Sequence, residues 1–339
     1  MVSIPSQWAD SVPMREHLVA TLREQGIIQS EDVAQAFLHT PREAFVSHYY
    51  EQEGSSQWGA RTAEMYEASV WLEKMYRDEP LVLLSSEKQH AISSSSAPAA
   101  MALMVEALHL QPGMRVLEIG TGSGYNAAIL ASLVGAPEFV TTIELDLNLA
   151  EQAERALHEY VGKISVHVGD GRLGVAEQAP YDAIIATASA PGFPYAWFEQ
   201  LAPYGRLVMD LQGSLRQSGF LILQKSADGC TAQGTFSQDY IYFMPLRPAE
   251  HEEPAFARLR GGKVQTLALA MPELSDILSN KAFHWFLQWR YPGLTLARST
   301  LRRDGLVGQN VMTLVDTKQE TLLQLFEQQE GLWRGQRYG

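Results

Sequence analysis

The segment VLEIGTGSGYNAAILA carries three glycines at alternate positions, Gly120, Gly122 and Gly124. The apolar run 116–119 is typical of a strand and residues 126–134 of a helix, so the glycines form the tight turn between them. Backbone N–H groups at the start of such a helix can bind a polar or anionic ligand. The spacing is GxGxG, whereas dinucleotide-binding folds show GxGxxG, and a tight turn without any ligand would also explain it.

Acidic residues lie at the ends of the neighbouring predicted strands. Glu144 ends the second strand, 20 residues after Gly124, where a carboxylate can accept hydrogen bonds from ribose hydroxyls. Asp170 and Gly171 follow the third strand, where the carboxylate could accept a hydrogen bond from an adenine amino group. Each acid alone is also consistent with an ordinary exposed loop. Together with Glu118 near the end of the first strand, however, they predict a nucleoside cradle at the carboxyl edge of a sheet.

Other features of the sequence exclude several chemistries. The single cysteine, Cys230, rules out an internal disulfide framework and a multi-thiolate site, and we expect no metal. The sequence contains no HExxH, no P-loop GxxxxGK and no GxSxG motif. Its 26 Lys and Arg against 39 Asp and Glu give a net charge of −13, which argues against nucleic acid as a partner. No apolar run is long enough to span a membrane and no signal peptide is apparent, so we expect a cytoplasmic protein without a membrane partner.

Strand-like and helix-like runs alternate from about residue 115 to residue 246, as expected of a parallel sheet with covering helices. We therefore predict an α/β fold with a doubly wound, Rossmann-like sheet. The expected strands are 116–119, 139–144, 164–168, 183–186 and 206–209, and the expected helices are 126–134 and 148–160. Two later strands, 220–224 and 241–243, are expected to be antiparallel.

Pattern and composition divide the chain into three predicted domains. Residues 1–60 form an N-terminal helical region, because apolar residues recur there at helical spacing. Residues 61–246 contain the parallel sheet and the glycine-rich turn. Residues 247–339 form a small α+β domain, since their 12 Lys and Arg against 10 Asp and Glu contrast with 14 against 29 in the preceding part.

Several segments, in collinear order, resemble the protein-L-isoaspartate O-methyltransferase family of S-adenosylmethionine-dependent enzymes. The resemblance covers roughly residues 14–246 and implies the methyltransferase fold, S-adenosylmethionine as cofactor, and a peptide or protein substrate containing Asp or isoAsp. Besides the glycine-rich turn, it rests on the segments 41–46 (PREAFV), 96–98 (SAP), 142–144 (TIE), 181–188 (YDAIIATA), 205–208 (GRLV) and 243–246 (FMPL).

The resemblance also implies roles for individual residues. Ser96 should meet the substrate carboxylate, although it could instead only cap the helix that begins at Pro98. Residues 93–95 and Ala99 depart from the sequence that is usual in the family. The implied cofactor-binding residues are Glu118, Gly120, Thr121, Gly122, Ser123, Gly124, Glu144, Asp170 and Gly171. The implied substrate-binding residues are Ser94, Ser95, Ala97, Thr187 and Ala188.

The C-terminal part favours one branch of the family. Repair enzymes are expected to end near residue 246 or to carry unrelated extensions, whereas members that accompany ribosomally made, modified peptides carry an extra C-terminal domain. The favoured hypothesis is therefore methylation of an Asp side chain in such a precursor peptide (RiPP biosynthesis), followed by loss of methanol to an aspartimide (succinimide) and possible hydrolysis to isoAsp.

Two alternatives stay open: general repair of isoAsp in damaged proteins, and a non-catalytic cofactor-binding partner in a peptide-modifying complex. Basic and aromatic residues of the C-terminal domain could bind an acidic or cyclic peptide, or could simply form a solvated basic face over a small aromatic core. These residues are Trp285, Trp289, Tyr291, Arg298, Arg302 and Arg303. The sequence sets neither the ring chemistry of the peptide nor the oligomeric state.

Overall fold

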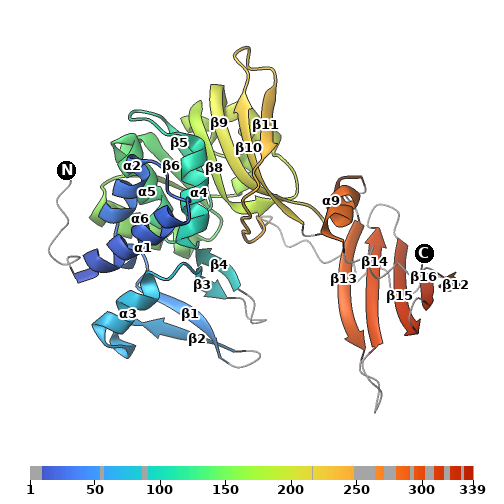
Figure 1. Cartoon of the computed structure of the whole chain (residues 1–339). Helices are drawn as coiled ribbons and strands as arrows, with labels where there is room; N and C mark the ends of the chain where they lie inside the picture. Colours follow the sequence, from blue (N-terminus) through green and yellow to red (C-terminus); the bar gives the residue numbers. More distant parts are fainter. Residues whose placement is uncertain are drawn as a thin grey trace. The chain divides into compact units, whose positions relative to one another are not determined.

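The computed structural model describes residues 10–53, 57–85, 91–215, 217–247, 264–270, 280–290, 294–301, 309–316, 321–329 and 332–338. The chain divides into two compact units. The first unit comprises residues 1–211 and 219–249, and the second comprises residues 212–218 and 250–339. Figure 1 shows the elements of each unit.

A seven-stranded sheet forms the centre of the first unit (Figure 1), in the order β11-β10-β9-β8-β5-β6-β7. Strands β5 to β9 are parallel, and the order reverses at β5, which lies between β6 and β8. Ligands of open α/β sheets bind at such a switch point. The predicted doubly wound α/β fold is confirmed. The strands are β5 (Val116–Ile119), β6 (Val140–Glu144), β7 (Ser165–Val168), β8 (Tyr181–Ala190), β9 (Leu201–Gln212), β10 (Ser218–Lys225) and β11 (Ala232–Phe236).

Alternate residues of the central strands pack into two different cores. Val116 and Ile185 share a core with Phe37 of the N-terminal helices, whereas Leu117 and Ile184 belong to a separate core. Because successive side chains of a strand point to opposite faces, apolar side chains cover both faces of the sheet. The helices of this unit are α1 (Val12–Glu24), α2 (Glu31–His39), α3 (Ala68–Met75), α4 (Pro98–Leu108), α5 (Tyr125–Val134), α6 (Leu147–Tyr160) and α7 (Tyr195–Gln200). Short 3-10 helices cover Arg42–Ala44, Ala63–Met65, Pro137–Phe139, Gly171–Leu173 and Ala176–Gln178.

A second sheet in the first unit is not predicted as a sheet, although the apolar run 80–84 indicates a short strand there. Its antiparallel strands lie in the order β2-β1-β3-β4. They are β1 (His48–Glu53), β2 (Gln57–Thr62), β3 (Leu81–Ser85) and β4 (Ala91–Ser95). The region 1–60, expected to be helical, therefore also contains the hairpin β1–β2, whose polar and half-exposed residues give no strong apolar alternation.

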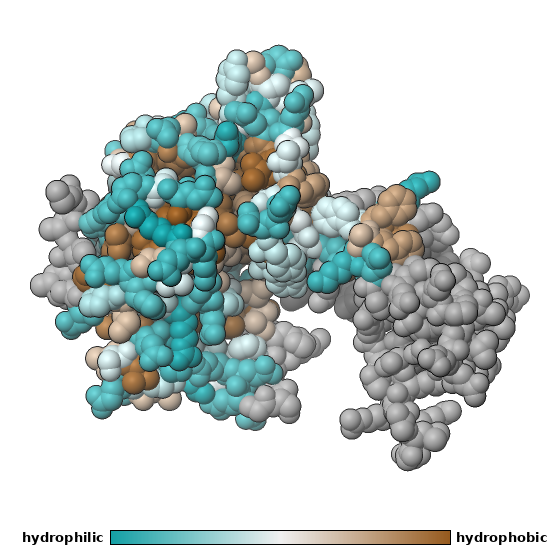
Figure 2. Space-filling view, in the orientation of Figure 1, coloured by the Kyte–Doolittle hydropathy of each residue, from teal (hydrophilic) through white to brown (hydrophobic). Residues whose placement is uncertain are grey.

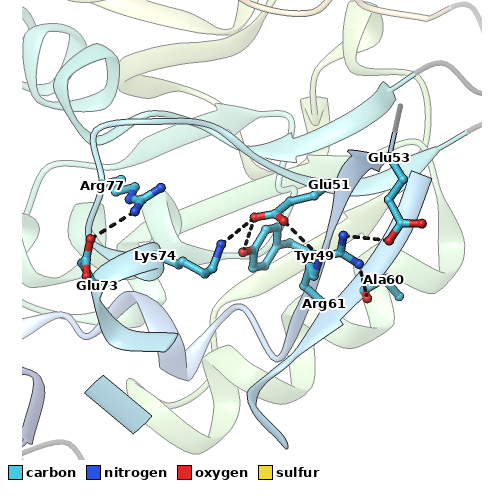
Figure 3. A network of polar contacts seen from close by, with 8 residues as sticks. All are labelled: Tyr49, Glu51, Glu53, Ala60, Arg61, Glu73, Lys74 and Arg77. Carbon is cyan, nitrogen blue, oxygen red and sulfur yellow. Dashed lines mark hydrogen bonds and ion pairs between the residues drawn. The ribbon is translucent and has the colours of Figure 1, made fainter. Parts of the chain in front are cut away.

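Ion pairs hold the hairpin β1–β2 and helix α3 together (Figure 3). The Glu51 carboxylate accepts hydrogen bonds from Tyr49 Oη at 2.8 Å, Arg61 Nε at 3.0 Å and Lys74 Nζ at 2.9 Å. Although partial burial raises the pKa of Glu51, these hydrogen bonds, led by the one from Lys74, outweigh it and lower the pKa to about 2. Hydrophilic residues accordingly dominate the part of Figure 2 where this sheet and α3 lie.

One expectation about local structure is wrong. Residues 241–243 form no strand, and the antiparallel strand on the outer side of β10 is β11. The apolar side chains of Ile241 and Phe243 are buried without forming a strand. The Phe243 backbone N–H donates a hydrogen bond to Asp210 Oδ2 at 2.9 Å. The polar run 93–96, for which the sequence predicts no regular structure, lies mostly in β4.

The second unit contains an antiparallel sheet and one helix among its described residues, in agreement with the predicted α+β class. The strands lie in the order β12-β16-β15-β14-β13. Within the unit, the Gln288 side chain of the helix accepts a hydrogen bond from the Gln217 N–H at 3.2 Å and donates one to the Gln217 carbonyl at 3.0 Å. The elements are β12 (Val264–Ala270), α9 (Lys281–Arg290), β13 (Leu294–Leu301), β14 (Gln309–Asp316), β15 (Thr321–Gln329) and β16 (Leu332–Tyr338).

The residues expected to bind a peptide in the C-terminal part lie mostly outside the described residues or are described by their backbone alone. Tyr291, Arg302 and Arg303 lie outside the described residues, and only the backbone is described for Trp289 and Arg298. Within the part of the chain that the structure describes, no helix is long and apolar enough to cross a membrane. The same residues contain no group of three or more His, Cys, Asp or Glu side chains that could hold a metal ion.

Candidate active site

A cavity of about 370 Å³ lies where β5, β6 and β8 end, and all of its lining residues belong to the first unit. This volume is within the range of small-molecule sites. The cavity has two walls. The first, the cofactor wall, comprises residues of the glycine-rich turn and of the ends of β6 and β8. The second, the acceptor wall, comprises residues 91–97 on β4 and at the start of α4. Residues 242–247 also line the cavity, together with Pro80, Val82, Ala100, Met101 and Gly171.

The glycine-rich turn has a geometry that needs glycine at two lining positions. Gly120 and Gly122 have φ values of +96° and +53°, in the left-handed region. A Cβ atom on Gly120 would lie 3.0 Å from Thr187 Oγ1, and one on Gly122 would lie 3.1 Å from the Ser94 carbonyl oxygen. Both the backbone conformation and the close approach of β4 and β8 therefore exclude larger residues. The glycines of the predicted turn therefore leave backbone groups accessible to a ligand in the cavity.

Glu144 ends β6 on the cofactor wall, as predicted, and is 6% exposed. Its Oε2 accepts a hydrogen bond from the Gly122 N–H at 3.0 Å, and its Oε1 accepts from Leu145 N–H at 2.9 Å and Asp146 N–H at 3.2 Å. A carboxylate offers about four acceptor positions, so at least one remains for a ligand hydroxyl. Glu144 thus both fixes the turn and can receive a ribose.

Glu118 lies behind the turn and is fully buried. Its carboxylate accepts hydrogen bonds from Asn126 Nδ2 at 2.8 Å and Thr142 Oγ1 at 2.7 Å, and Thr142 Oγ1 is also 2.8 Å from Thr121 Oγ1. Burial, partly offset by these two hydrogen bonds, raises the pKa of Glu118 to about 7. Glu118 therefore joins β5, β6 and α5 as much as it lines the cavity.

The cofactor wall fits S-adenosylmethionine. Asn126 Oδ1 is buried on this wall and has no hydrogen-bond partner among the described residues. An unsatisfied buried acceptor is costly in a protein interior, and an ammonium group of a ligand would satisfy it. The open backbone at Gly120 and Gly122 and the acceptor position on Glu144 supply the other complementary groups.

The remaining predicted cofactor residues differ in position. Thr121 and Ser123 line the cavity, whereas Gly124 (φ +86°) packs against Leu157 of α6, where a Cβ atom would lie 3.0 Å from Leu157 Cγ. Gly171 lines the cavity.

Asp170 does not line the cavity, and its carboxylate is paired with Arg172 Nη2 at 2.6 Å. The structure therefore does not bring Asp170 to the site in the way that the sequence predicts, because Arg172, two residues further on, binds its carboxylate.

The acceptor wall contains Ser94, Ser95, Ser96 and Ala97, which line the cavity as predicted. The alternative role of Ser96 as a helix cap is wrong. Helix α4 has Ala97 as its N-cap residue without a side-chain cap, and the Ala99 N–H donates instead to Asp78 Oδ1 at 2.8 Å. Asp78 precedes β3 in sequence, so this cap is non-local. The Ser96 hydroxyl is therefore not needed to start the helix.

Thr187 and Ala188 line the cavity on the other side, in β8. Thr187 Oγ1 donates to the Gly120 carbonyl at 2.7 Å, so this side chain also holds the glycine-rich turn. The predicted residues from five separate segments thus meet at one cavity, and Gly124 and Asp170 are the two that do not line it.

Arg42 is a positioning residue that the sequence prediction missed. It is fully buried, and its Nη2 donates to the carbonyls of Ser95 at 3.1 Å and Ser96 at 2.9 Å. Its Nη1 donates to the Met75 carbonyl at 2.9 Å, and its Nη2 also donates to the Glu79 carbonyl at 3.1 Å. Burial lowers the pKa of Arg42 to about 10, so it remains protonated at neutral pH. Arg42 thus fixes the acceptor wall, and the PREAFV segment was the only signal of it.

Comparison with known proteins decides the family. A family model described as Protein-L-isoaspartate(D-aspartate) O-methyltransferase (PCMT) matches residues 13–250. The chain belongs to this family. PCMT proteins depend on S-adenosylmethionine, so the chain is assigned to the EC 2.1.1 methyltransferases with S-adenosylmethionine as its cofactor.

Two relatives illustrate the extent of the similarity within the PCMT family. A protein-L-isoaspartate O-methyltransferase of Thermotoga maritima is 36% identical over 215 residues, which cover 62% of this chain and 60% of the relative. One from Pyrococcus horikoshii is 38% identical over 213 residues, which cover 62% of this chain and 83% of the relative. The matched part thus spans less than two thirds of the Thermotoga relative.

Two solved structures are similar to this PCMT chain. One, titled protein-L-isoaspartate O-methyltransferase, is 26% identical with a TM-score of 0.59, and the match covers 96% of this chain and 87% of that chain. The other, a putative protein-L-isoaspartate O-methyltransferase from Plasmodium falciparum in complex with S-adenosyl-L-homocysteine, is 20% identical with a TM-score of 0.53. That match covers 69% of this chain and 98% of that chain, and it shows a shared fold.

Proposed function

We propose that this protein methylates the free carboxylate of an isoaspartyl residue in peptides or proteins, using S-adenosylmethionine. The observation that carries the proposal is a cavity in which the cofactor wall, with Gly122 and Glu144, faces the acceptor wall with Ser96. The relatives named for this activity support the same substrate class.

The chemistry explains why the cavity needs no catalytic base. The acceptor carboxylate is already ionised at pH 7, because the free group of isoAsp is an α-carboxyl with a usual pKa of about 3.3–3.7. S-adenosylmethionine, when bound, supplies a methyl group activated on a sulfonium. The protein's own contribution is to hold both partners in line and to exclude water. Ser96 can donate a hydrogen bond to the acceptor carboxylate, while Arg42 and Asp78 keep the serine segment in place.

The test compares two linear peptides that are identical except for isoAsp or normal Asp at one position. The full-length protein is incubated with labelled S-adenosylmethionine, and base-labile methyl ester and S-adenosyl-L-homocysteine are measured. We expect ester formation on the isoAsp peptide and little on the Asp peptide. If cofactor binds but neither linear peptide is methylated, the proposed activity is wrong.

A second candidate is methylation of a normal Asp in a modified precursor peptide, which yields an aspartimide after loss of methanol. Two observations favour it: the second compact unit beyond the family match and the serines at 93–95 on the acceptor wall. However, the match to a solved protein-L-isoaspartate O-methyltransferase covers 96% of this chain, so a C-terminal extension does not by itself point to peptide maturation.

The same assay separates the candidates when a cyclised precursor peptide with normal Asp is added as a third substrate. Preference for the cyclised peptide would support peptide maturation, provided that methanol is released and the product is lighter than the starting peptide by a net loss of one water. Cofactor binding without transfer to any peptide would favour the third possibility, a non-catalytic partner protein. The full chain is required, because the turn 212–218 belongs to the second unit and would lose its contact with α9 in a truncated protein.

A further inference from the structure

Three charged side chains line the cavity in the part of the chain that the structure describes: Glu118, Glu144 and Arg247. The two glutamates already accept hydrogen bonds from the chain on both carboxylate oxygens. Arg247 is half-buried, and none of the ion pairs between described residues includes it. The lining therefore offers one cation to an incoming anion.

The backbone that carries Arg247 is held firmly against the central sheet. The Ser189 N–H donates to the Met244 carbonyl at 2.9 Å, and the Leu246 N–H donates to the Ser189 carbonyl at 2.7 Å. Leu246 packs against Gly171, since a Cβ atom on Gly171 would lie 3.3 Å from Leu246 Cδ2. These contacts end one residue before Arg247. Its guanidinium is thus presented at the cavity by a fixed backbone and not by a long loop.

The charge of Arg247 can offset the negative charge of the unit that surrounds it. Residues 1–246 carry 14 Lys and Arg against 29 Asp and Glu, and the Glu144 carboxylate lines the cavity itself. An acidic peptide approaching this unit is repelled unless a local cation compensates. Arginine presents a planar fork of donors that can bind a carboxylate through two parallel hydrogen bonds. Tyr242, which lines the same cavity and is 51% exposed, adds an aromatic surface for the peptide backbone.

We propose that Arg247 binds an acidic side chain of the substrate that flanks the methylated residue, so that the enzyme selects acidic peptides. This inference rests on the proposed function, because it assumes that a peptide enters the cavity. It names a second carboxylate on the substrate, distinct from the one that accepts the methyl group.

The test uses two linear isoAsp peptides that differ only in Glu or Gln on both sides of the isoAsp. Binding to the full-length protein loaded with S-adenosyl-L-homocysteine is measured by fluorescence anisotropy, and kcat/KM is measured separately with S-adenosylmethionine. We expect the wild type to prefer the Glu peptide about three- to tenfold, the range of a partly exposed charged hydrogen bond. Arg247→Gln should lower this preference to about one, and Arg247→Lys should keep part of it.

A matched control is Arg155→Gln, which removes the same charge from an exposed position on α6 outside the cavity and should keep the wild-type preference. In roughly 1 M salt, where the Debye length is ~3 Å, the wild-type preference should shrink. A wild type without preference, or an Arg247→Gln variant that keeps it, would overturn the inference. So would an equal loss for both peptides, which would place Arg247 at the reacting carboxylate or in the fold.

Measuring binding and turnover separately distinguishes failure of the proposed function from failure of the inference about Arg247. If the Glu peptide binds better through Arg247 but no methyl ester forms on either peptide, the proposed function fails and the carboxylate site stands. If ester forms equally on both peptides and Arg247→Gln changes neither, the proposed function stands and this inference fails.

Discussion

The two walls of the cavity differ in how far apart their residues lie in the sequence. The cofactor wall is largely continuous in sequence: strand β5, the glycine-rich turn and helix α5 follow one another, and Glu144 ends the adjacent strand. The acceptor wall depends on residues far away in sequence, since Arg42 holds the carbonyls of Ser95 and Ser96 and Asp78 caps the helix that follows. A local motif can therefore predict cofactor binding, whereas substrate recognition depends on tertiary contacts.

The largest expected effect concerns the acceptor wall. Arg42→Met removes a buried cation and leaves at least four backbone carbonyls without their donor. We expect the free energy of unfolding to fall by about 3–5 kcal/mol, as for other buried charged groups that lose a partner. Urea unfolding measures it, with Arg23→Met, an exposed arginine of α1, as control. A loss below about 1 kcal/mol would show that the wall does not depend on Arg42.

The next effect concerns the buried carboxylate of the cofactor wall. Because the pKa of Glu118 is raised to about 7 from a usual value of 4.5, the folded protein holds this proton more tightly than the unfolded chain. Its contribution to stability is therefore complete below pH ~4.5 and is lost as the pH rises towards ~7, by up to about 3 kcal/mol. Glu118→Gln should lack this fall, since Gln does not ionise.

Urea unfolding of the wild type and of Glu118→Gln at several pH values between ~4.5 and ~7.5 tests this prediction. The stability difference between the two proteins should change steadily across that range. Parallel curves would show that Glu118 is ionised in the folded protein throughout.

A smaller effect is expected on cofactor affinity. Glu144→Ala removes the acceptor of the Gly122 N–H and the carboxylate available to the ribose. The loss should be roughly 1.5–3 kcal/mol, or ~10- to 150-fold in Kd. Calorimetry with S-adenosyl-L-homocysteine measures it, with Glu151→Ala on the exposed face of α6 as control. An unchanged Kd in Glu144→Ala would contradict the assignment of the cofactor wall.

The sequence predicted the parts of the fold in which local pattern and final structure agree. Strands β5 and β6 are wholly buried, so their apolar runs identify them, and the glycines between β5 and α5 are dictated by positive φ values. The hairpin β1–β2 was missed because ion pairs around Glu51, which no periodicity reveals, hold it to α3. Residues 241–243 were assigned to a strand because they are apolar, but Asp210 binds their backbone in place of a neighbouring strand.

The candidate site shows the same contrast. Seven of the nine predicted cofactor residues line the cavity, because their positions follow from strand ends. Asp170 also lies at a strand end, but its pairing with Arg172 could not be foreseen from strand order. Arg42 and Asp78 were missed as positioning residues, since their partners are more than 20 residues away along the chain.

The central claim is that one wall binds the cofactor and the other positions the acceptor carboxylate. The most direct test is Ser96→Ala, measured for both cofactor affinity and single-turnover methyl transfer to an isoAsp peptide. Ser96 lies on the acceptor wall and does not cap α4, so its hydroxyl can hold the carboxylate in line without supporting the helix. The Kd for S-adenosylmethionine should stay within about twofold of wild type, while the transfer rate falls about tenfold, or ~1.4 kcal/mol. A normal transfer rate, or a parallel loss of affinity and rate, would contradict the account.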